Sequence, residues 1–193
     1  MEKRPNIDQY IAEALKVLRA GGIILYPTDT VWGIGCDAEN ADAVAKIYAL
    51  KKRVDSKGML VLVEKPERID SYVDEVPEIA WSLIEVADSP LTIIYPGARN
   101  LPNNLVPAEK TVGIRVVKHH FCEMLIRKLN RPLVSTSANI SGKPSPIYFH
   151  DIDQEIIDGV DYVVPTEAEE DHTGKPSSII MLGVGGQVKI IRE

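Results

Sequence analysis

Four short segments hold side chains that together could bind an anionic nucleotide and a small polar ligand. They are residues 26–33, 46–57, 111–116 and 135–145, and they are rich in hydroxyl groups, cations or small amides. Hydroxyl and backbone N–H donors gathered in turns form anion-binding nests, and Arg and Lys bind phosphate or carboxylate oxygens. Such residues favour ligand binding and charge neutralisation over attack by a protein nucleophile.

Residues 26–33 and 135–145 gather small polar side chains at the ends of predicted buried strands. The first segment reads YPTDTVWG and the second reads STSANISGKPS. Ligands of open α/β sheets bind beyond strand ends. However, Thr, Asp, Ser and Asn also form capped turns that bind nothing. Each segment alone therefore leaves a binding role and a structural turn as open alternatives.

Residues 46–57 concentrate positive charge in an acidic chain. The segment holds four lysines and one arginine against one aspartate, a net charge of +4, whereas the whole chain carries −6. Cations favour the C-terminal end of a helix dipole, but this concentration exceeds what a cap needs. Arg53 can fork onto phosphate oxygens, while Lys51 and Lys57 act as point charges. A triphosphate is the predicted target.

Residues 111–116 read TVGIRV, an apolar strand interrupted by Arg115. An arginine inside an apolar strand rarely stays unpaired. Its predicted partner is either a carboxylate of the protein or a carboxylate of a ligand, and the strand alone does not choose between them.

Hydrophobic patterning predicts the elements that position these segments. Apolar runs predict strands at 23–26, 59–63, 91–95, 111–117, 132–136, 161–164, 178–182 and 187–192. Helices are predicted from an Asp8 N-cap to Gly21-Gly22, at about 40–50, 119–129 and 151–157, and after Pro66 and Pro77. Residues 27–38 fit neither period, and 97–110 and 165–177 are long loops. Apolar strands that alternate with helices indicate an α/β fold with a largely covered sheet.

Length and composition narrow the class of protein. The 193 residues predict a single domain over 1–193, and the net charge of −6 argues against a protein that mainly coats nucleic acid. Two cysteines exclude a disulfide scaffold or a four-cysteine zinc site, and the four histidines lack metal-ligand spacing. No apolar run has the length of a membrane span, so a cytoplasmic location without membrane contact is expected.

Two further motifs fail in context. Residues 33–38 fit a loose dinucleotide fingerprint but do not follow a strand directly, and residues 174–177 lack the first glycine of a P-loop. No G-x-S-x-G motif supports a serine hydrolase. Covalent catalysis is therefore not indicated.

Six segments in register resemble the short, single-domain YrdC-like threonylcarbamoyl-AMP synthases over about residues 10–192. They are YPTDTVWGIGCDA, Lys51-x-Arg53 with Lys57, TVGIRV, SANISG, PSSII and the terminal IIR. The resemblance implies a twisted mixed α/β sheet with flanking helices around a concave cavity. It also implies formation of threonylcarbamoyl-AMP and pyrophosphate from L-threonine, bicarbonate and ATP, for threonylcarbamoyladenosine modification of tRNA.

The resemblance also implies roles for individual residues. Arg115 would clamp the threonine carboxylate, with Thr30, Ser135 and Ser177 on its other polar groups, although Ser178 stays an alternative to Ser177. ATP would contact Lys51, Arg53, Lys57, Thr111, Ser137, Asn139, Ser145 and Arg192, with Lys51, Arg53 and Arg115 as catalytic residues. Mg²⁺ would arrive with ATP and need no dedicated protein ligands. Residues 165–177 are the candidate lid.

This chain departs from the family pattern at four positions and leaves other functions open. Trp32 replaces a usual tyrosine, Gly58 a frequent proline, Leu62 a histidine of some members and Pro176 a common glutamate. One alternative is a paralogue with another carbamoyl substrate, as in hydrogenase-maturation carbamoyltransferases. The other is an RNA-binding module of ribosome maturation without catalysis. Expected partners are the transferase proteins that consume the product; contact with tRNA or double-stranded RNA and the oligomeric state are left open.

Overall fold

A computed structural model describes residues 6–52, 59–183 and 185–193, so Arg53, Lys57 and Gly58 lie outside the described residues. The α-helices are α1 (Ile7–Arg19), α2 (Ala41–Leu50), α3 (Glu78–Val86), α4 (His120–Leu129) and α5 (Gln154–Gly159), and three short 3₁₀ helices are η1 (Pro66–Ser71), η2 (Phe149–Asp151) and η3 (Thr166–Ala168). The strands are β1 (Ile24–Tyr26), β2 (Gly33–Gly35), β3 (Leu60–Val63), β4 (Leu91–Pro96), β5 (Thr111–Val116), β6 (Leu133–Ser137), β7 (Tyr162–Val163), β8 (Ser178–Leu182) and β9 (Val188–Arg192).

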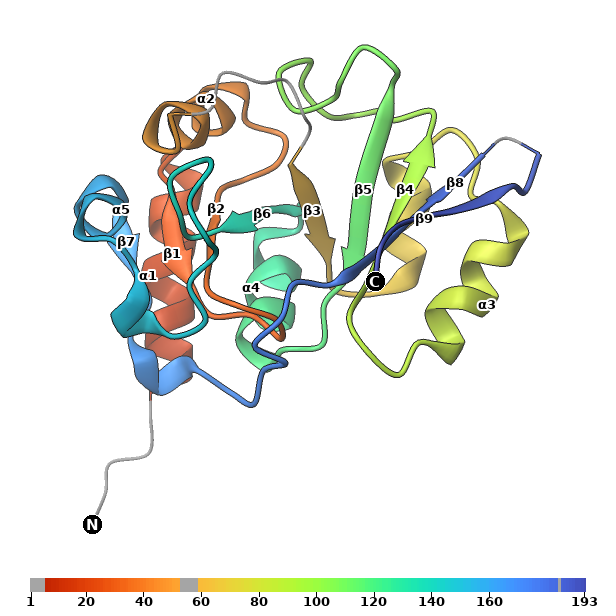
Figure 1. The fold of residues 1–193 in the computed structure, drawn as a ribbon. Coiled ribbons are helices and arrows are strands. Elements are labelled where there is room, and N and C mark those ends of the chain that lie inside the picture. Colours follow the sequence, from red (N-terminus) through yellow and green to blue (C-terminus); the bar gives the residue numbers. More distant parts are fainter. Residues whose placement is uncertain (1–5, 53–58, 184) are drawn as a thin grey trace.

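All of these strands form one twisted sheet in the order β7-β1-β2-β6-β3-β5-β4-β8-β9 (Figure 1). Three neighbouring pairs are parallel, namely β1–β7, β3–β5 and β4–β8, and the other pairs are antiparallel. The predicted fold class, a mixed α/β sheet with flanking helices, is confirmed.

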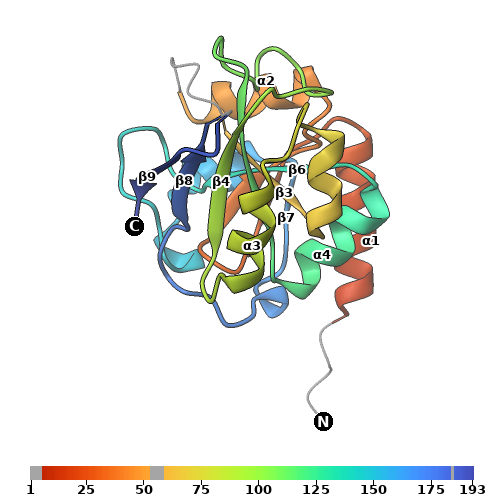
Figure 2. The same cartoon turned by 90° about the vertical axis from the view of Figure 1, so that its right-hand side faces the viewer.

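Side-chain alternation along the strands builds a hydrophobic core on each face of the sheet. Ile24, Tyr26 and Leu62 pack with α1 and α4, which lie side by side (Figure 2). Leu25 and Val61 point to the other face, where they pack with buried residues of α2 and α3. Because successive strand residues point to opposite faces, one apolar strand can serve two cores. This arrangement explains why the predicted strands are apolar throughout.

Two predicted details were wrong and a third is specified further. The N-cap of α1 is Asn6, whose side chain accepts a hydrogen bond from Gln9 N, and Asp8 lies in the first turn. The helix predicted at Pro66 is present as the 3₁₀ helix η1, with Pro66 in its first turn. The stretch 27–38 was predicted as irregular but contains β2, which pairs with β1 and β6. Two of the three residues of β2 are glycine, so its sequence carries no alternation signal.

Gly35 is required where β2 crosses the sheet. A Cβ atom at this position would lie 2.5 Å from Val134 O and 2.7 Å from Cε1 of Tyr26. Real Cβ atoms do not approach backbone oxygens so closely, so the strand can pass here only as glycine.

No helix in the three described ranges is both long enough and apolar enough to cross a bilayer.

Candidate functional site

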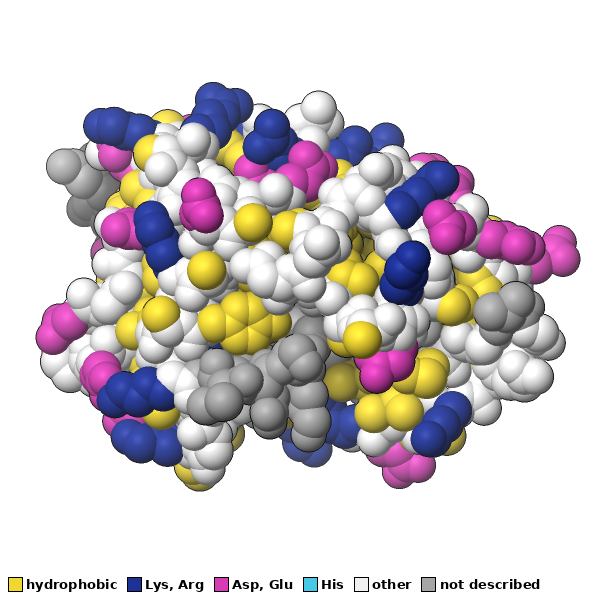
Figure 3. Space-filling model, turned by 90° about the horizontal axis from the view of Figure 1, so that it is seen from above, with side chains coloured by type: hydrophobic (Ala, Val, Ile, Leu, Met, Phe, Trp, Pro, Cys, Tyr) yellow, Lys and Arg dark blue, Asp and Glu magenta, His cyan; other side chains and the backbone are white. Residues whose placement is uncertain are grey.

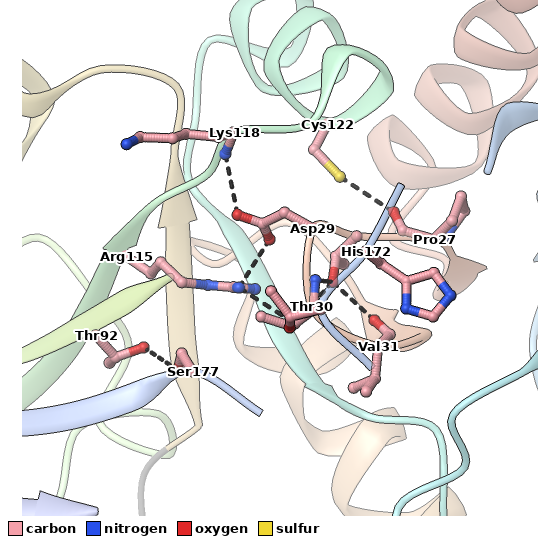
Figure 4. A network of polar contacts seen from close by, with 12 residues as sticks. Pro27, Asp29, Thr30, Val31, Thr92, Arg115, Lys118, Cys122, His172 and Ser177 are labelled. Atoms are coloured by element: carbon pink, nitrogen blue, oxygen red, sulfur yellow. Dashed lines mark hydrogen bonds and ion pairs between the residues drawn. The ribbon is translucent and has the colours of Figure 1, made fainter. Parts of the chain in front are cut away.

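Arg115 is a buried cation on the central strand β5, with 2% of its surface exposed. Its Nη1 donates to Asp29 Oδ1 at 2.7 Å and to Thr30 Oγ1 at 3.2 Å (Figure 4). Its Nε is also buried and has no hydrogen-bond partner among the described residues. Of the two partners predicted for Arg115, the carboxylate of the protein is therefore present, and it is Asp29. The Nε–H group of Arg115 is still available to donate to a ligand.

The turn after β1 holds Asp29 in place. Thr28 Oγ1 donates to Val31 O at 2.7 Å and lies 2.9 Å from Thr30 Oγ1. The backbone N–H of Lys118 donates to Asp29 Oδ2 at 3.1 Å, so each oxygen of this carboxylate has a partner (Figure 4). Asp29 was recognised as part of the turn but was not predicted as a site residue. The sequence did contain a sign of this role. Asp29 is an acidic residue just after a predicted buried strand, and Arg115 in another buried strand needs an acidic partner.

A polar cavity of about 190 Å³ opens in front of Arg115, between the turn, β6 and the start of β8. Seven residues predicted to bind substrates line it: Thr30, Arg115, Ser135, Ser137, Ser145, Ser177 and Arg192. They come from segments up to 162 residues apart in sequence (192 − 30). The fold therefore brings together the residues predicted to bind threonine and part of the set predicted to bind ATP.

Ser177 and Arg192 form the wall of this cavity opposite the turn. Ser177 Oγ lies 2.7 Å from Thr92 Oγ1, and Arg192 donates to Ser177 O from Nε at 3.0 Å and from Nη2 at 2.7 Å. Ser178 lies within β8, paired with Leu91, so the structure favours Ser177 as the cavity residue. Thr92 was missed, although it is the one small hydroxyl residue in an otherwise hydrophobic strand.

Two guanidinium groups make the cavity electropositive. Burial, followed by the neighbouring Arg115, lowers the pKa of Arg192 from its ordinary value. Arg115 and Arg192 can lie in the same space because each donates to acceptors of the protein. Asp29 and Thr30 accept from Arg115, and the carbonyl of Ser177 accepts from Arg192. A bound anion would lower the cost of keeping both charges buried.

Lys51 and Asn139 shape the loop after β6 and do not line the polar cavity. Lys51 Nζ donates to the carbonyls of Ser137 at 2.5 Å and Asn139 at 2.7 Å. Asn139 Nδ2 donates to Lys143 O at 2.7 Å and its Oδ1 accepts from Ser137 Oγ at 2.5 Å. Both residues therefore hold the loop in shape, and their direct contacts with a nucleotide stay predictions.

Thr111 lines a second cavity of about 420 Å³ that adjoins the first. Met59, Leu60 and Ile179 line both cavities, so the two spaces are neighbours across the same side chains. Together they form a small polar compartment beside a larger and more apolar one. Such a pair suits an amino acid next to a nucleotide.

The segment 165–177 lies across the turn after β1. Thr173 N donates to Asp29 O and Gly174 N donates to Thr30 O, both at 3.1 Å. Trp32 Nε1 donates to Glu169 Oε1 at 3.2 Å. The structure thus places this segment beside the cavity, and its movement as a lid stays a prediction.

Among the described residues, no group of three His, Cys, Asp or Glu side chains is arranged to hold a metal ion. The binding of Mg²⁺ together with ATP stays a prediction.

Comparison with known proteins agrees with the geometry. A family model described as telomere recombination (Sua5/YciO/YrdC) matches residues 16–193. Proteins named threonylcarbamoyl-AMP synthase from Coxiella burnetii and Stutzerimonas stutzeri are 34% and 38% identical, over 70% and 72% of this chain and 74% and 75% of theirs.

A solved structure is similar to nearly the whole fold. P. abyssi Sua5 complexed with L-threonine superposes with a TM-score of 0.84 at 27% identity, over 93% of this chain and 52% of that one. This chain thus spans about half the length of that protein.

Proposed function

Since the chain belongs to the Sua5/YciO/YrdC family, we propose that it is a threonylcarbamoyl-AMP synthase that uses L-threonine, bicarbonate and ATP. The observation that carries this proposal is the buried Arg115 with an unpartnered Nε beside a small hydroxyl-lined cavity. A guanidinium binds a carboxylate through charge-assisted hydrogen bonds, and a carboxylate is small enough for this space.

L-Threonine fits the polar cavity. Its carboxylate binds Arg115, and its hydroxyl and amino groups meet Thr30, Ser135 and Ser177, which line the same space. The P. abyssi relative has been solved with L-threonine. A cavity with several fixed hydroxyl partners discriminates strongly against ligands that cannot satisfy them.

ATP occupies the adjoining space. Ser137, Ser145 and Arg192 line the polar cavity and Thr111 lines the adjoining one, while Lys51 and Asn139 hold the loop after β6. Arg53 and Lys57 complete the predicted phosphate contacts. Mg²⁺ comes bound to the nucleotide and supplies charge neutralisation for the phosphates.

The reaction needs no nucleophilic side chain. The threonine amine takes up bicarbonate with loss of water to give a carbamate, whose oxygen then attacks the α-phosphorus of ATP and displaces pyrophosphate. Arg115 fixes the amino acid, and Arg192 with the predicted cations stabilises the charge on the departing group. Catalysis of this kind comes from positioning and preorganised charge.

The product contains a mixed anhydride that water hydrolyses, so the proposed function includes transfer to a tRNA-modifying partner in the cytoplasm. The segment 165–177 lies beside the cavity and is the part of the chain proposed to exclude water during the reaction.

Release of pyrophosphate from ATP tests the proposal. We expect release that depends on both L-threonine and bicarbonate, and Arg115→Ala should lower kcat/KM for threonine about a hundredfold, equivalent to roughly 3 kcal/mol. Arg127→Ala, an exposed arginine on α4, is the matched control and should behave as the wild type. Pyrophosphate release that is equal without threonine would disprove the proposed substrate.

A further inference from the structure

A large apolar cavity of about 650 Å³ lies on the other face of the strands that carry the substrate site. Ile114 and Val116 line it from β5, Ile93 lines it from β4, and Trp81 and Ile84 of α3 form its outer wall. Arg115, between Ile114 and Val116, points to the polar cavity instead. This apolar cavity therefore lies on the other face of these strands, and Asp29 and Thr173 line its edge nearest the turn after β1.

Helix α3 covers the cavity incompletely. Ala80 is the one buried residue of this helix, whereas Trp81 and Ile84 are half-buried. Ile79 is 40% exposed and Val86 is 73% exposed. These two residues are seven positions apart, about 10 Å along the helix. They lie on the side of α3 turned away from the cavity, so Trp81 and Ile84 border its opening. An apolar cavity that stays open to solvent in this way has the form of a protein-docking surface.

Most of the residues that line this groove come from an acidic stretch of the chain. Residues 69–98 contain six carboxylates and no Lys, Arg or His. All six are exposed: Asp70, Asp74, Glu75, Glu78, Glu85 and Asp88. Within the described ranges, none of them forms an ion pair. Acidic side chains are outermost at the end of the molecule where α3 lies (Figure 3).

Two other charged groups line the cavity, and both already have partners. Lys118 Nζ donates to Ala87 O at 3.3 Å, just beyond the end of α3. Asp29 is held by Arg115 and by the backbone N–H of Lys118. Lys118 keeps its positive charge, because a carbonyl acceptor does not neutralise an ammonium group. Glu85 and Asp88 outnumber it, so the net charge of the lining is negative.

We propose that this groove docks a basic amphipathic helix of a partner protein. An apolar side chain of that helix enters the cavity beside Trp81, and its lysines or arginines face Glu85 and Asp88. The acidic rim repels nucleic acid, and it would also repel the same face of a second copy of this chain. This proposal does not depend on the reaction proposed above.

Two synthetic 18-residue peptides test the charge requirement. One carries leucines at helical i, i+3, i+4 and i+7 spacing with lysines elsewhere, and the other has the same leucines with glutamates. Binding is followed by calorimetry and by Trp81 fluorescence, with Trp81→Phe to identify that signal. We expect the lysine peptide to bind and to weaken with added salt, and the glutamate peptide not to bind.

Charge reversal locates the binding to this groove. Glu85→Lys with Asp88→Lys should weaken the lysine peptide about tenfold, because two attractions at the rim become two repulsions. Glu13→Lys with Asp42→Lys, at exposed positions of α1 and α2, makes the same change in net charge and should have no such effect. Equal weakening by the two double variants would overturn the proposal, since it would indicate binding through net charge alone.

Removal of an apolar group from the cavity wall tests the other half of the proposal. Ile84→Ser, at a half-buried residue that lines the cavity, should weaken the lysine peptide, whereas Val188→Ser, at an exposed valine of β9, should not. Circular dichroism should show that both variants stay folded. If phenethylamine alone shifts Trp81 fluorescence with the affinity of the peptide, the cavity is a small-molecule site and the docking proposal is wrong.

Discussion

Arg115 and Asp29 form an ion pair whose side chains are 3% and 8% exposed. A buried pair of this kind contributes little net stability while it is intact, but removal of one partner strands the other charge. Substitution of one or both residues of the pair can therefore distinguish the effect of Arg115 on stability from its effect on substrate binding.

Arg115→Ala should lower the free energy of unfolding by about 3–5 kcal/mol, because Asp29 is left as an uncompensated buried charge. Arg115→Ala combined with Asp29→Asn should recover much of that loss, since the carboxylate is gone. Urea unfolding at pH 7 measures both. The double variant should still lack threonine-dependent pyrophosphate release, and recovery of activity would contradict the role of Arg115.

Individual residues were predictable where their type was out of place in the sequence. Arg115 in an apolar strand was found for this reason. Its partner was not, because Asp29 lies 86 residues away and only the paired strands bring the two together. The same limit applies to Lys51. Its acceptors, the carbonyls of Ser137 and Asn139, are 86 and 88 residues away in sequence, so the sequence alone did not reveal them.

Strands and helices were predictable to within a few residues wherever they carry apolar side chains. The exception was β2, whose sequence is Gly33-Ile34-Gly35. Glycine gives a strand no hydrophobic period, so the position of β2 depends on close packing against Tyr26 and Val134 and not on its own propensity. This short element matters because it pairs Gly33 with Ser137 beside the cavity.

Gly35→Ala should destabilise the protein by roughly 1–3 kcal/mol, because the added methyl group overlaps Val134 O and the Tyr26 ring. Gly113→Ala on β5 is the matched control, since its Cβ would meet its nearest atom at 3.4 Å. For a chain of this size the loss corresponds to a fall in Tm of about 2–4 °C per kcal/mol. Thermal unfolding of both variants measures the difference, and equal melting temperatures would show that β2 does not need glycine.

At the scale of the whole molecule, His119 links folding to pH. It joins β5 to α4, it is 1% exposed, and both ring nitrogens lack partners among the described residues. Burial lowers its pKa below 6.5, and the charge of His120 acts in the same direction. The nearby carboxylates of Glu170, Asp29 and Glu169 oppose that shift.

A histidine whose pKa is depressed in the folded state binds its proton more readily when unfolded. Its contribution to stability is therefore complete above pH 6.5 and is lost as the pH falls below that value. The free energy of unfolding should decrease between pH 7 and pH 5.5 by up to about 1.4 kcal/mol per pH unit. Urea unfolding at several pH values measures this slope, and His119→Leu should flatten it. An unchanged slope in the variant would assign the effect to other groups.

The alternation of β5 has a consequence for insertions and deletions. Arg115 faces the polar compartment, and its neighbours Ile114 and Val116 face the apolar one. A shift of one residue would turn every side chain of the strand around, placing a guanidinium among hydrocarbon and isoleucine against the substrate anion. A shift of two residues would restore the orientation of each position. Homologous chains should therefore differ in length at the loops flanking 111–116 and keep a constant length within it.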